Sequence, residues 1–324
     1  MVTNWTHSEA KYCFRLQKKY CITLRSEGQR LLARTHKPGV GGSNPPLATI
    51  NMKTNLLMFC LSLQPDHLEK IENLNYIPVG LGSKKFSEKW FEDKKGENIA
   101  NKNEYYGEYT FHYWLWKNYI DKLPNKWIGF SQYRKFFTLS NTFKNDFTLK
   151  NLSNKIIKNI PEDFNEYDVI LGNEFYINQL RISKFLKKNF KKIVLNPRLL
   201  TNKNKRTIRF HFDMWHGDGN LTKAIDCLPN SDKNDFKDFV DSNVSFNPHN
   251  MFICKSKDIL ENYYKIIFLW LEKCEEVFGF TKSADYGQKR MYGFLAERFM
   301  SYWFKKNTKH KLIPIIGSDI TNLK

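Results

Sequence analysis

Short apolar runs of strand length alternate with segments of helical periodicity from residue 55 to the end of the chain. The apolar runs lie at residues 55–63, 76–80, 127–133, 167–171, 193–195, 246–255 and 312–316. This alternation is typical of an α/β fold, because a helix must return the chain to the same end of the sheet before the next parallel strand can form. We therefore predict an α/β domain with a mostly parallel central sheet. None of the runs approaches the ~18 apolar residues that a membrane-spanning helix needs.

The helical patterns lie between these runs. Apolar residues step by three or four in residues 103–119, 258–278 and 291–304, which predicts a helix in each segment. Residues 196–243 are instead rich in Asn, Asp, Gly and His, so we expect an irregular segment there.

Residues 1–51 follow neither period. They carry eight basic and two acidic residues, and residues 35–49 are rich in Gly and Pro. The codons for Gly-Ser-Asn-Pro at residues 42–45 can also be read as the T-arm of a transfer-RNA gene. We therefore expect residues 1–51 to be a non-native or disordered leader, with the true start at Met52 and one domain over residues 52–324. A Gly/Pro-rich linker behind a basic arm is the alternative interpretation.

The chain carries a formal net charge of +19, which raises the question of nucleic-acid binding. Of its 52 basic residues, 41 are Lys and 11 are Arg, and the Lys are scattered along the sequence. Together with 32 Asn, this composition is typical of an AT-rich genome, because Lys and Asn have AA-rich codons. We therefore expect no nucleic acid as partner, and assign the charge to an anionic small substrate or to peripheral contact with an anionic membrane.

Several common catalytic motifs are absent from the sequence. There is no Gly-x-Gly-x-x-Gly fingerprint, phosphate loop or Gly-x-Ser-x-Gly elbow, which excludes the dehydrogenases, P-loop ATPases and serine hydrolases that carry them. No Cys-x-x-Cys or His-Glu-x-x-His motif supports a zinc site. The six Cys show no paired spacing, which disfavours a disulfide scaffold and favours the cytoplasm.

Four segments carry longer motifs, at residues 96–118, 127–137, 250–255 and 293–298. The first runs from Gly-Glu-Asn-Ile to Tyr-Trp-Leu-Trp-Lys-Asn, and the second reads Trp-Ile-Gly-Phe-Ser-Gln-Tyr-Arg-Lys-Phe-Phe. In this order they resemble a bacterial family of unknown function that accompanies capsular and exopolysaccharide biosynthesis. That family is grouped with glycosyltransferases of the GT-A type. The resemblance covers about residues 55–317 and implies a single GT-A-like domain that uses a nucleotide-sugar donor.

The resemblance points to the segment at residues 132–134, in which Tyr133 and Arg134 are the donor-site candidates. GT-A enzymes usually carry Asp-x-Asp there, holding a divalent cation on the donor diphosphate. This chain has no carboxylate in that segment, and Gln132 replaces the usual His of the family. We expect Arg134 to supply the charge of the metal, because a guanidinium grips phosphate through two parallel hydrogen bonds. A structural ion pair with Glu108 is the alternative for Arg134.

Glu108 and Asn98 are the other donor-site candidates, beside Tyr133 and Arg134. Glu108 lies among the aromatic residues of the predicted helix 103–119, where a carboxylate is either paired or functional. Asn98 precedes that helix and is a candidate contact to the nucleotide base or ribose. No cofactor is firmly implied, and no metal ligands are assigned. A divalent cation, Mn²⁺ or Mg²⁺, is the option left open.

The acceptor side is expected at residues 246–252 and on the last predicted helix. The resemblance implies His249, Asn250 and Arg298 as acceptor-side residues. A histidine satisfied within a turn is the alternative for His249.

Transfer with inversion needs a base that takes the proton of the acceptor hydroxyl. Glu297 is the first candidate, followed by Asp213 and Asp218. A buried structural pair between Glu297 and Arg298 is the alternative to catalysis.

These features predict a glycosyltransferase that moves a sugar from a nucleotide-sugar donor to a surface-polysaccharide or lipid-linked glycan acceptor. The expected place is the cytoplasm, with peripheral contact at the inner face of the plasma membrane. A non-catalytic protein of the same fold that binds glycan or nucleotide is the first alternative, because Asp-x-Asp is missing. A nucleic-acid-binding protein is the second.

Overall fold

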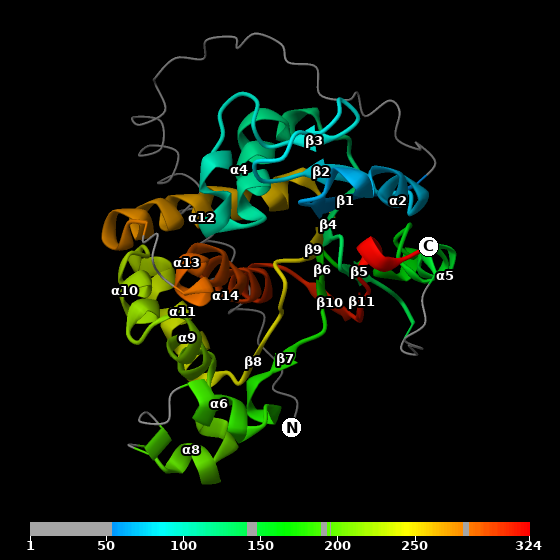
Figure 1. The fold of residues 1–324 in the computed structure, drawn as a ribbon. Coiled ribbons are helices and arrows are strands. Elements are labelled where there is room, and N and C mark those ends of the chain that lie inside the picture. Colours follow the sequence, from blue (N-terminus) through cyan, green and yellow to red (C-terminus); the bar gives the residue numbers. More distant parts are fainter. Residues whose placement is uncertain (1–53, 141–147, 189–192, 195, 281–284) are drawn as a thin grey trace, which may run out of the picture. The chain divides into compact units, whose positions relative to one another are not determined.

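The computed structural model describes residues 54–140, 148–188, 193–194, 196–280 and 285–324 (Figure 1). The predicted leader and Met52 lie outside the described residues. The described residues form a nine-stranded sheet. Its strands are β1 (Leu56–Ser62), β2 (Ile77–Gly80), β3 (Phe91–Glu92), β4 (Trp127–Gln132), β5 (Lys135–Phe137), β6 (Val169–Gly172), β9 (Phe252–Cys254), β10 (His310–Ile313) and β11 (Ile315–Gly317). A separate pair joins β7 (Phe175–Tyr176) to β8 (Ser245–Phe246).

The main path through the sheet has the order β10-β6-β9-β4-β1-β2-β3, and β5 and β11 extend it from β4. Strands β1, β2, β3 and β4 are parallel to one another. β9 lies antiparallel between β4 and β6, and β10 is parallel to β6. β6 and β10 therefore run in the same direction as β1 to β4. The predicted α/β class with a mostly parallel sheet is confirmed.

Strand β1 is buried along its whole length and shows why this sheet is covered on both faces. Successive side chains of a strand point to opposite faces. Leu57, Phe59 and Leu61 belong to one hydrophobic core, and the residues between them belong to the other. A strand buried on both faces is expected to be an uninterrupted apolar run, and residues 56–61 are one.

Helices pack on both faces of the sheet (Figure 1). The first core contains side chains of α4 (Tyr109–Asn118), α12 (Lys257–Phe278) and α14 (Met291–Asn307). The second contains side chains of α2 (Leu68–Asn73) and α5 (Leu149–Lys155). The predicted helices 258–278 and 291–304 are therefore confirmed as α12 and α14, and both contribute to the same core.

The prediction that residues 196–243 are irregular is wrong. They form α8 (Arg198–Thr201), α9 (Ile208–His216), α10 (Asn220–Asp226) and α11 (Asn230–Ser242). Thr207 caps α9 by accepting a hydrogen bond from Phe210 N at 3.4 Å. Phe212 and Phe236 are fully buried and anchor α9 and α11 in the first core. The few apolar residues of this polar segment fall on the buried faces of short helices. The average composition of the segment does not reveal this pattern.

The predicted helix 103–119 is broken. α3 (Asn103–Tyr106) ends at Gly107, and α4 begins two residues later. Gly107 has φ +58° and ψ −131°, a conformation that is costly for any residue with a Cβ. Asn103 Nδ2 spans the break, donating to Gly107 O at 2.9 Å and to Thr110 Oγ1 at 3.1 Å. The break places Glu108 at the start of α4 rather than inside a helix.

Three predicted strands also differ from the structure. Residues 246–255 form β8 and β9 with an irregular segment at 247–251, and residues 312–316 divide into β10 and β11 around Pro314. Residues 193 and 194, predicted as part of a strand, are helical. Further helices are α6 (Ile182–Lys188) and α13 (Tyr286–Lys289).

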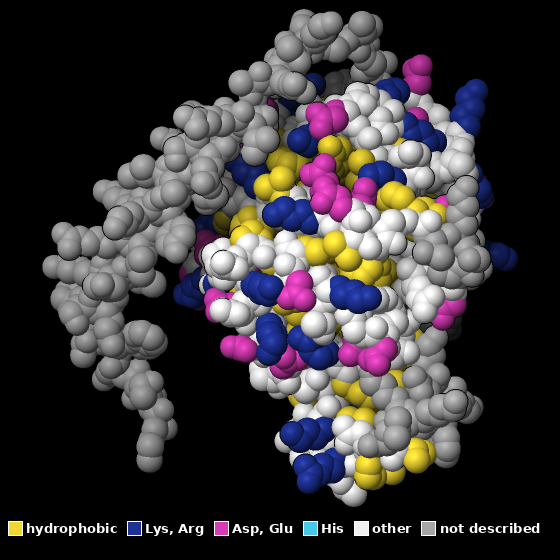
Figure 2. Space-filling model, turned by 90° about the vertical axis from the view of Figure 1, so that its left-hand side faces the viewer, with side chains coloured by type: hydrophobic (Ala, Val, Ile, Leu, Met, Phe, Trp, Pro, Cys, Tyr) yellow, Lys and Arg dark blue, Asp and Glu magenta, His cyan; other side chains and the backbone are white. Residues whose placement is uncertain are grey.

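Charged residues of both signs share the face drawn in Figure 2, where Lys and Arg side chains stand among Asp and Glu. Among the described residues, Lys306 lies 3.2 Å from Asp232 and 2.7 Å from Asp235. That face therefore shows no continuous basic track. Among the described helices, none has the length and apolar character that crossing a membrane requires.

Candidate functional site

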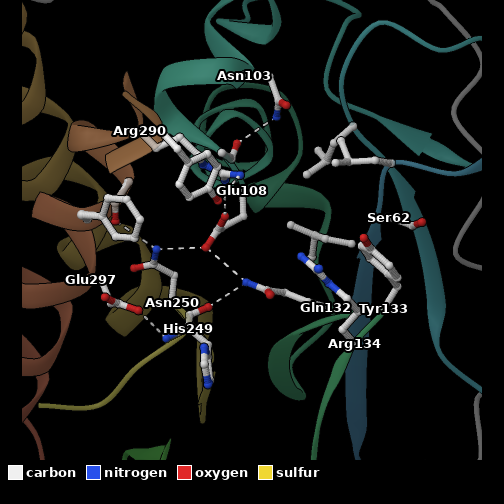
Figure 3. Close-up of a pocket in the computed structure, with 17 residues that line it drawn as sticks. Ser62, Asn103, Glu108, Gln132, Tyr133, Arg134, His249, Asn250, Arg290 and Glu297 are labelled. Atoms are coloured by element: carbon white, nitrogen blue, oxygen red, sulfur yellow. Dashed lines mark hydrogen bonds and ion pairs between the residues drawn. The ribbon is translucent and has the colours of Figure 1, made fainter. Parts of the chain in front are cut away.

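A pocket opens at the carboxyl ends of β1 and β4 (Figure 3). The chain passes from β1 to β2 on one side, while β4 pairs with β1 on the other side, so the strand order reverses here. Ligands of open α/β sheets bind at such a reversal, outside the carboxyl ends of the strands. The strand ends of the sheet contribute Leu61, Ser62 and Gln132 to the pocket, and the segments that follow β1, β2 and β4 contribute Leu63, Leu81, Tyr133 and Arg134. The remaining lining comes from α3 and the α3–α4 junction, residues 249–250, α13 and α14.

Glu108 is the centre of a polar network in this pocket (Figure 3). Its Oε1 accepts hydrogen bonds from Asn250 Nδ2 at 2.9 Å and from Gln132 Nε2 at 3.2 Å. Its Oε2 lies 3.3 Å from the guanidinium of Arg290. Glu108 thus links β4, the segment before β9 and the start of α14. Its charge is met by Arg290, so the alternative of an ion pair between Glu108 and Arg134 is wrong.

His249 and Asn250 form a strained turn that directs backbone groups into the pocket. Their φ angles are +79° and +53°, a region that Asn tolerates better than most residues. His249 N donates to Glu297 Oε1 at 2.6 Å, and His249 O accepts from Gln132 Nε2 at 2.9 Å. Asn250 is buried, and its Oδ1 has no hydrogen-bond partner among the described residues.

Glu297 and Arg298 are adjacent on α14 and form a buried ion pair. Glu297 is 9% exposed and Arg298 is 1% exposed. The Arg298 guanidinium lies 4.1 Å from the centre of the Phe246 ring, and its Nη2 lies 3.1 Å from His211 Nδ1. Burial raises the pKa of Glu297, while the charge of Arg298 opposes that rise. The result is a carboxyl group that is readier to accept a proton than an exposed one.

Arg134 follows β4 directly, as predicted, and its exposed side chain lines the pocket (Figure 3). The guanidinium packs over the Tyr133 ring at 4.9 Å, and that ring in turn lies 5.0 Å from His67. No carboxylate of the described residues forms an ion pair with Arg134. Its charge is therefore not already neutralised within that part of the chain.

The imidazole of His249 is uncharged at neutral pH. Burial, with a smaller contribution from the charge of Lys135, lowers the pKa of His249 to about 4. Both predicted acceptor-side residues of this turn thus offer neutral groups.

Six of the predicted site residues line one pocket, namely Glu108, Tyr133, Arg134, His249, Asn250 and Glu297. Arg298 lies directly behind it, paired with Glu297.

Three predicted residues are not brought into the pocket. The Asn98 amide closes its own loop, donating to Gly96 O at 2.8 Å and to Lys94 O at 3.0 Å. Asp213 lies on α9 and Asp218 follows that helix. Of the candidates for the base, Glu297 alone contacts the pocket.

The carboxylates in the pocket do not form a cation site. In the part of the chain that the structure describes, no three His, Cys, Asp or Glu side chains come together in a way that could hold a metal ion. Glu108 and Glu297 are each paired with an arginine. The donor set therefore does not fit a divalent cation, which takes several oxygen ligands.

Arg290 was missed by the sequence analysis. It precedes α14 and lines the pocket through its ion pair with Glu108. The signal was present, because Arg is scarce in this chain and each Arg stands out against a background of Lys.

Comparison with known families gives a match over residues 61–308 to the family described as a domain of unknown function, DUF4422. The chain belongs to this family. The four predicted motif segments all lie within the matched range. A comparison with curated proteins finds no match.

The DUF4422 chain also shares its fold with a glycosyltransferase. A solved apo structure of the bifunctional glycosyltransferase WbbM superposes with a TM-score of 0.52 at 18% sequence identity. The match covers 81% of this chain and 45% of that one. The predicted resemblance to a glycosyltransferase-like family of unknown function is thus confirmed at the level of family and fold.

Proposed function

We propose that this protein is a glycosyltransferase that uses a nucleotide-sugar donor. The observation that carries the proposal is the pocket at the β1–β4 strand ends, which combines an unneutralised arginine with a buried carboxylate. The likeness of the fold to a glycosyltransferase supports it.

The donor is proposed to bind on the side of the pocket formed by Tyr133 and Arg134. A guanidinium can offer two charge-assisted hydrogen bonds to a diphosphate. Arg134 has no carboxylate partner among the described residues, so it needs no rearrangement to bind an anion. Arg290 lines the same pocket, where its ion pair with Glu108 holds it in place.

Glu297 is proposed as the base. In a direct displacement, its carboxylate takes the proton of an acceptor hydroxyl while that oxygen forms a bond to the anomeric carbon. The bond from the anomeric carbon to the diphosphate breaks, and the nucleoside diphosphate leaves with the electron pair. Arg134 stabilises the developing negative charge. The hydrogen bond from His249 N holds the Glu297 carboxylate in place.

The acceptor is proposed to be a surface polysaccharide or a lipid-linked glycan. The resemblance of the four motif segments to proteins of capsular and exopolysaccharide biosynthesis supports this class. The excess of Lys would favour peripheral contact with anionic lipid at the inner face of the plasma membrane.

The test is a screen of the purified protein against UDP-, GDP-, CMP- and dTDP-sugars, with nucleotide release measured in EDTA and in Mn²⁺ or Mg²⁺. We expect nucleotide release from one donor class, at a similar rate in EDTA and in Mn²⁺ or Mg²⁺. Saturable binding without any release would instead favour a non-catalytic binding protein. Absence of both binding and release across the panel would overturn the proposed function.

A further inference from the structure

A second cavity adjoins the donor pocket on the far side of Glu297. The two share four lining residues, His249, Tyr286, Phe294 and Glu297. Glu108 and Glu297 are the carboxylates that line the first, and Asp285 and Glu297 those that line the second. Glu297 is therefore the one carboxylate of the described lining residues that belongs to both.

Aromatic rings form most of the lining of this second cavity. The Trp215 ring stacks on His211, with centroids 4.8 Å apart and planes at 22°. These two residues lie four positions apart on α9, so they share one face of that helix. On the other side, Phe294 stacks on His216 at 4.1 Å and 26°. The cavity thus presents fixed, flat apolar surfaces rather than flexible aliphatic chains.

A buried ion pair adds polar groups to the aromatic lining of the cavity. Glu297 and Arg298 form this pair, and the guanidinium packs on the Phe246 ring. Arg298 Nε is buried without a hydrogen-bond partner among the described residues. A buried donor without an acceptor costs stability unless a ligand supplies one. A few polar groups in a mostly aromatic cavity orient a ligand that is itself part apolar and part polar.

A sugar ring has this character. Its C–H faces carry partial positive charge and pack on the electron-rich faces of aromatic rings, while its hydroxyl edge needs hydrogen-bonding partners. A purely apolar ligand would leave Arg298 Nε unsatisfied, and a free anion would gain nothing from Trp215.

We infer that the second cavity binds the terminal sugar ring of the acceptor, with Trp215 as its stacking surface and Glu297 at its reactive hydroxyl. This inference rests on the proposed function. It assigns the two cavities to the two substrates, and it places Glu297 where a donor carbon and an acceptor oxygen can both reach it. Trp215 acts as a specificity residue and takes no part in the chemistry.

The experiment measures binding of octyl β-glycosides (glucoside, galactoside, mannoside and N-acetylglucosaminide) to the full chain without donor, by calorimetry. The variants are Trp215→Ala and Trp215→Phe. The matched control is Trp116→Ala, because Trp116 is also half-buried and stacked, on Phe268 at 5.6 Å, but lines neither cavity. Titration with 1-octanol reports binding of the alkyl chain alone.

We expect at least one glycoside to bind more tightly than octanol, and Trp215→Ala to weaken that binding about tenfold or more, with Trp215→Phe intermediate. Trp116→Ala should bind as the wild type does. The inference is overturned if no glycoside binds better than octanol, or if Trp215→Ala binds normally. Nucleotide release from the donor without acceptor, measured on wild type and Trp116→Ala, is the separate test of the proposed function, and Trp116→Ala should leave it within about twofold of wild type.

Discussion

At the scale of single residues, Glu297 has two roles that compete. It neutralises Arg298 in a buried pair, and it lines both cavities that are proposed to hold the two substrates. Removing one partner of a buried pair leaves an uncompensated charge, which costs about 3–5 kcal/mol. The sequence analysis treated the structural pair and the catalytic base as alternatives. The geometry is compatible with both roles, so the activity and the stability of a Glu297 variant have to be measured together.

We predict that Glu297→Gln lowers kcat by about 10²–10⁴-fold, the range for loss of a general base. Donor affinity should change little, because Glu297 does not touch the proposed diphosphate site at Arg134. The melting temperature should also fall, since Arg298 loses its counter-charge. Asp213→Asn is the control, and should retain activity, because Asp213 lines neither cavity. Unchanged kcat in Glu297→Gln would remove the catalytic role.

The pH dependence follows from the direction of the Glu297 pKa. Burial raises this pKa above that of an unfolded glutamate, so the folded protein binds more protons in the window between the two values. The contribution of Glu297 to stability therefore falls as pH rises through that window. A base must be ionised, so kcat should show an acid limb, falling as pH drops through the raised pKa. A pH–rate profile that is flat on its acid side would contradict this assignment.

At the scale of elements, the site depends on where helices and strands are interrupted. Gly107 divides the predicted helix 103–119 and sets Glu108 at the start of α4. The turn at His249 and Asn250 divides a predicted strand and brings backbone groups to Glu297 and Gln132. Periodicity predicted the helix and strand that are present in this region, but it could not predict the interruptions. The turn at His249, for example, is held by partners 48 and 117 residues away in the sequence.

We predict that Gly107→Ala weakens donor binding as well as stability. A Cβ at Gly107 would lie 2.0 Å from Arg290 Nη2, so the guanidinium must move away from Glu108. The backbone strain adds on the order of 1–3 kcal/mol. Gly279→Ala is the matched control, because Gly279 has φ +59° but no atom near the position of the new Cβ.

Both variants should lower the free energy of unfolding, measured by urea titration. Only Gly107→Ala should also lower donor affinity. Equal donor affinity in the two variants would show that the pairing of Arg290 with Glu108 does not shape the pocket.

At the scale of the whole molecule, the sequence predicted the fold class because the strongest signal, uninterrupted apolar runs, belongs to strands buried on both faces. Five of the six candidate residues that line the pocket lie in the family motifs, and the sixth, His249, directly precedes one of them. The helices of residues 198–242 were missed because their apolar positions are few and the segment is rich in polar residues. Asn98 shows the opposite error, since it lies inside a recognised motif but only closes a loop.

We predict that removal of residues 1–51 leaves the melting temperature within about 2 °C of the full chain, which corresponds to about 1 kcal/mol in a domain of this size. The reason is that the sheet begins at Leu56 and β1 is already covered on both faces by residues of the described chain. A loss of several kcal/mol on this truncation would show that the leader is part of the fold.

In the molecule as a whole, Arg134 rather than a bound metal ion is proposed to supply the positive charge for a donor diphosphate. The described residues gather no metal-binding cluster, and Arg134 stands unneutralised at the β1–β4 strand ends. The most direct test is calorimetric titration of the donor identified in the nucleotide-sugar screen into wild type and Arg134→Lys, each with EDTA and with Mn²⁺. Arg198→Lys, an exposed arginine outside the pocket, is the control.

The account predicts that wild type and Arg198→Lys bind equally in EDTA and in Mn²⁺. Arg134→Lys should bind about ten- to a hundredfold more weakly in both, because lysine keeps the charge but loses the paired hydrogen bonds. Strict dependence on Mn²⁺ together with normal binding by Arg134→Lys would contradict it.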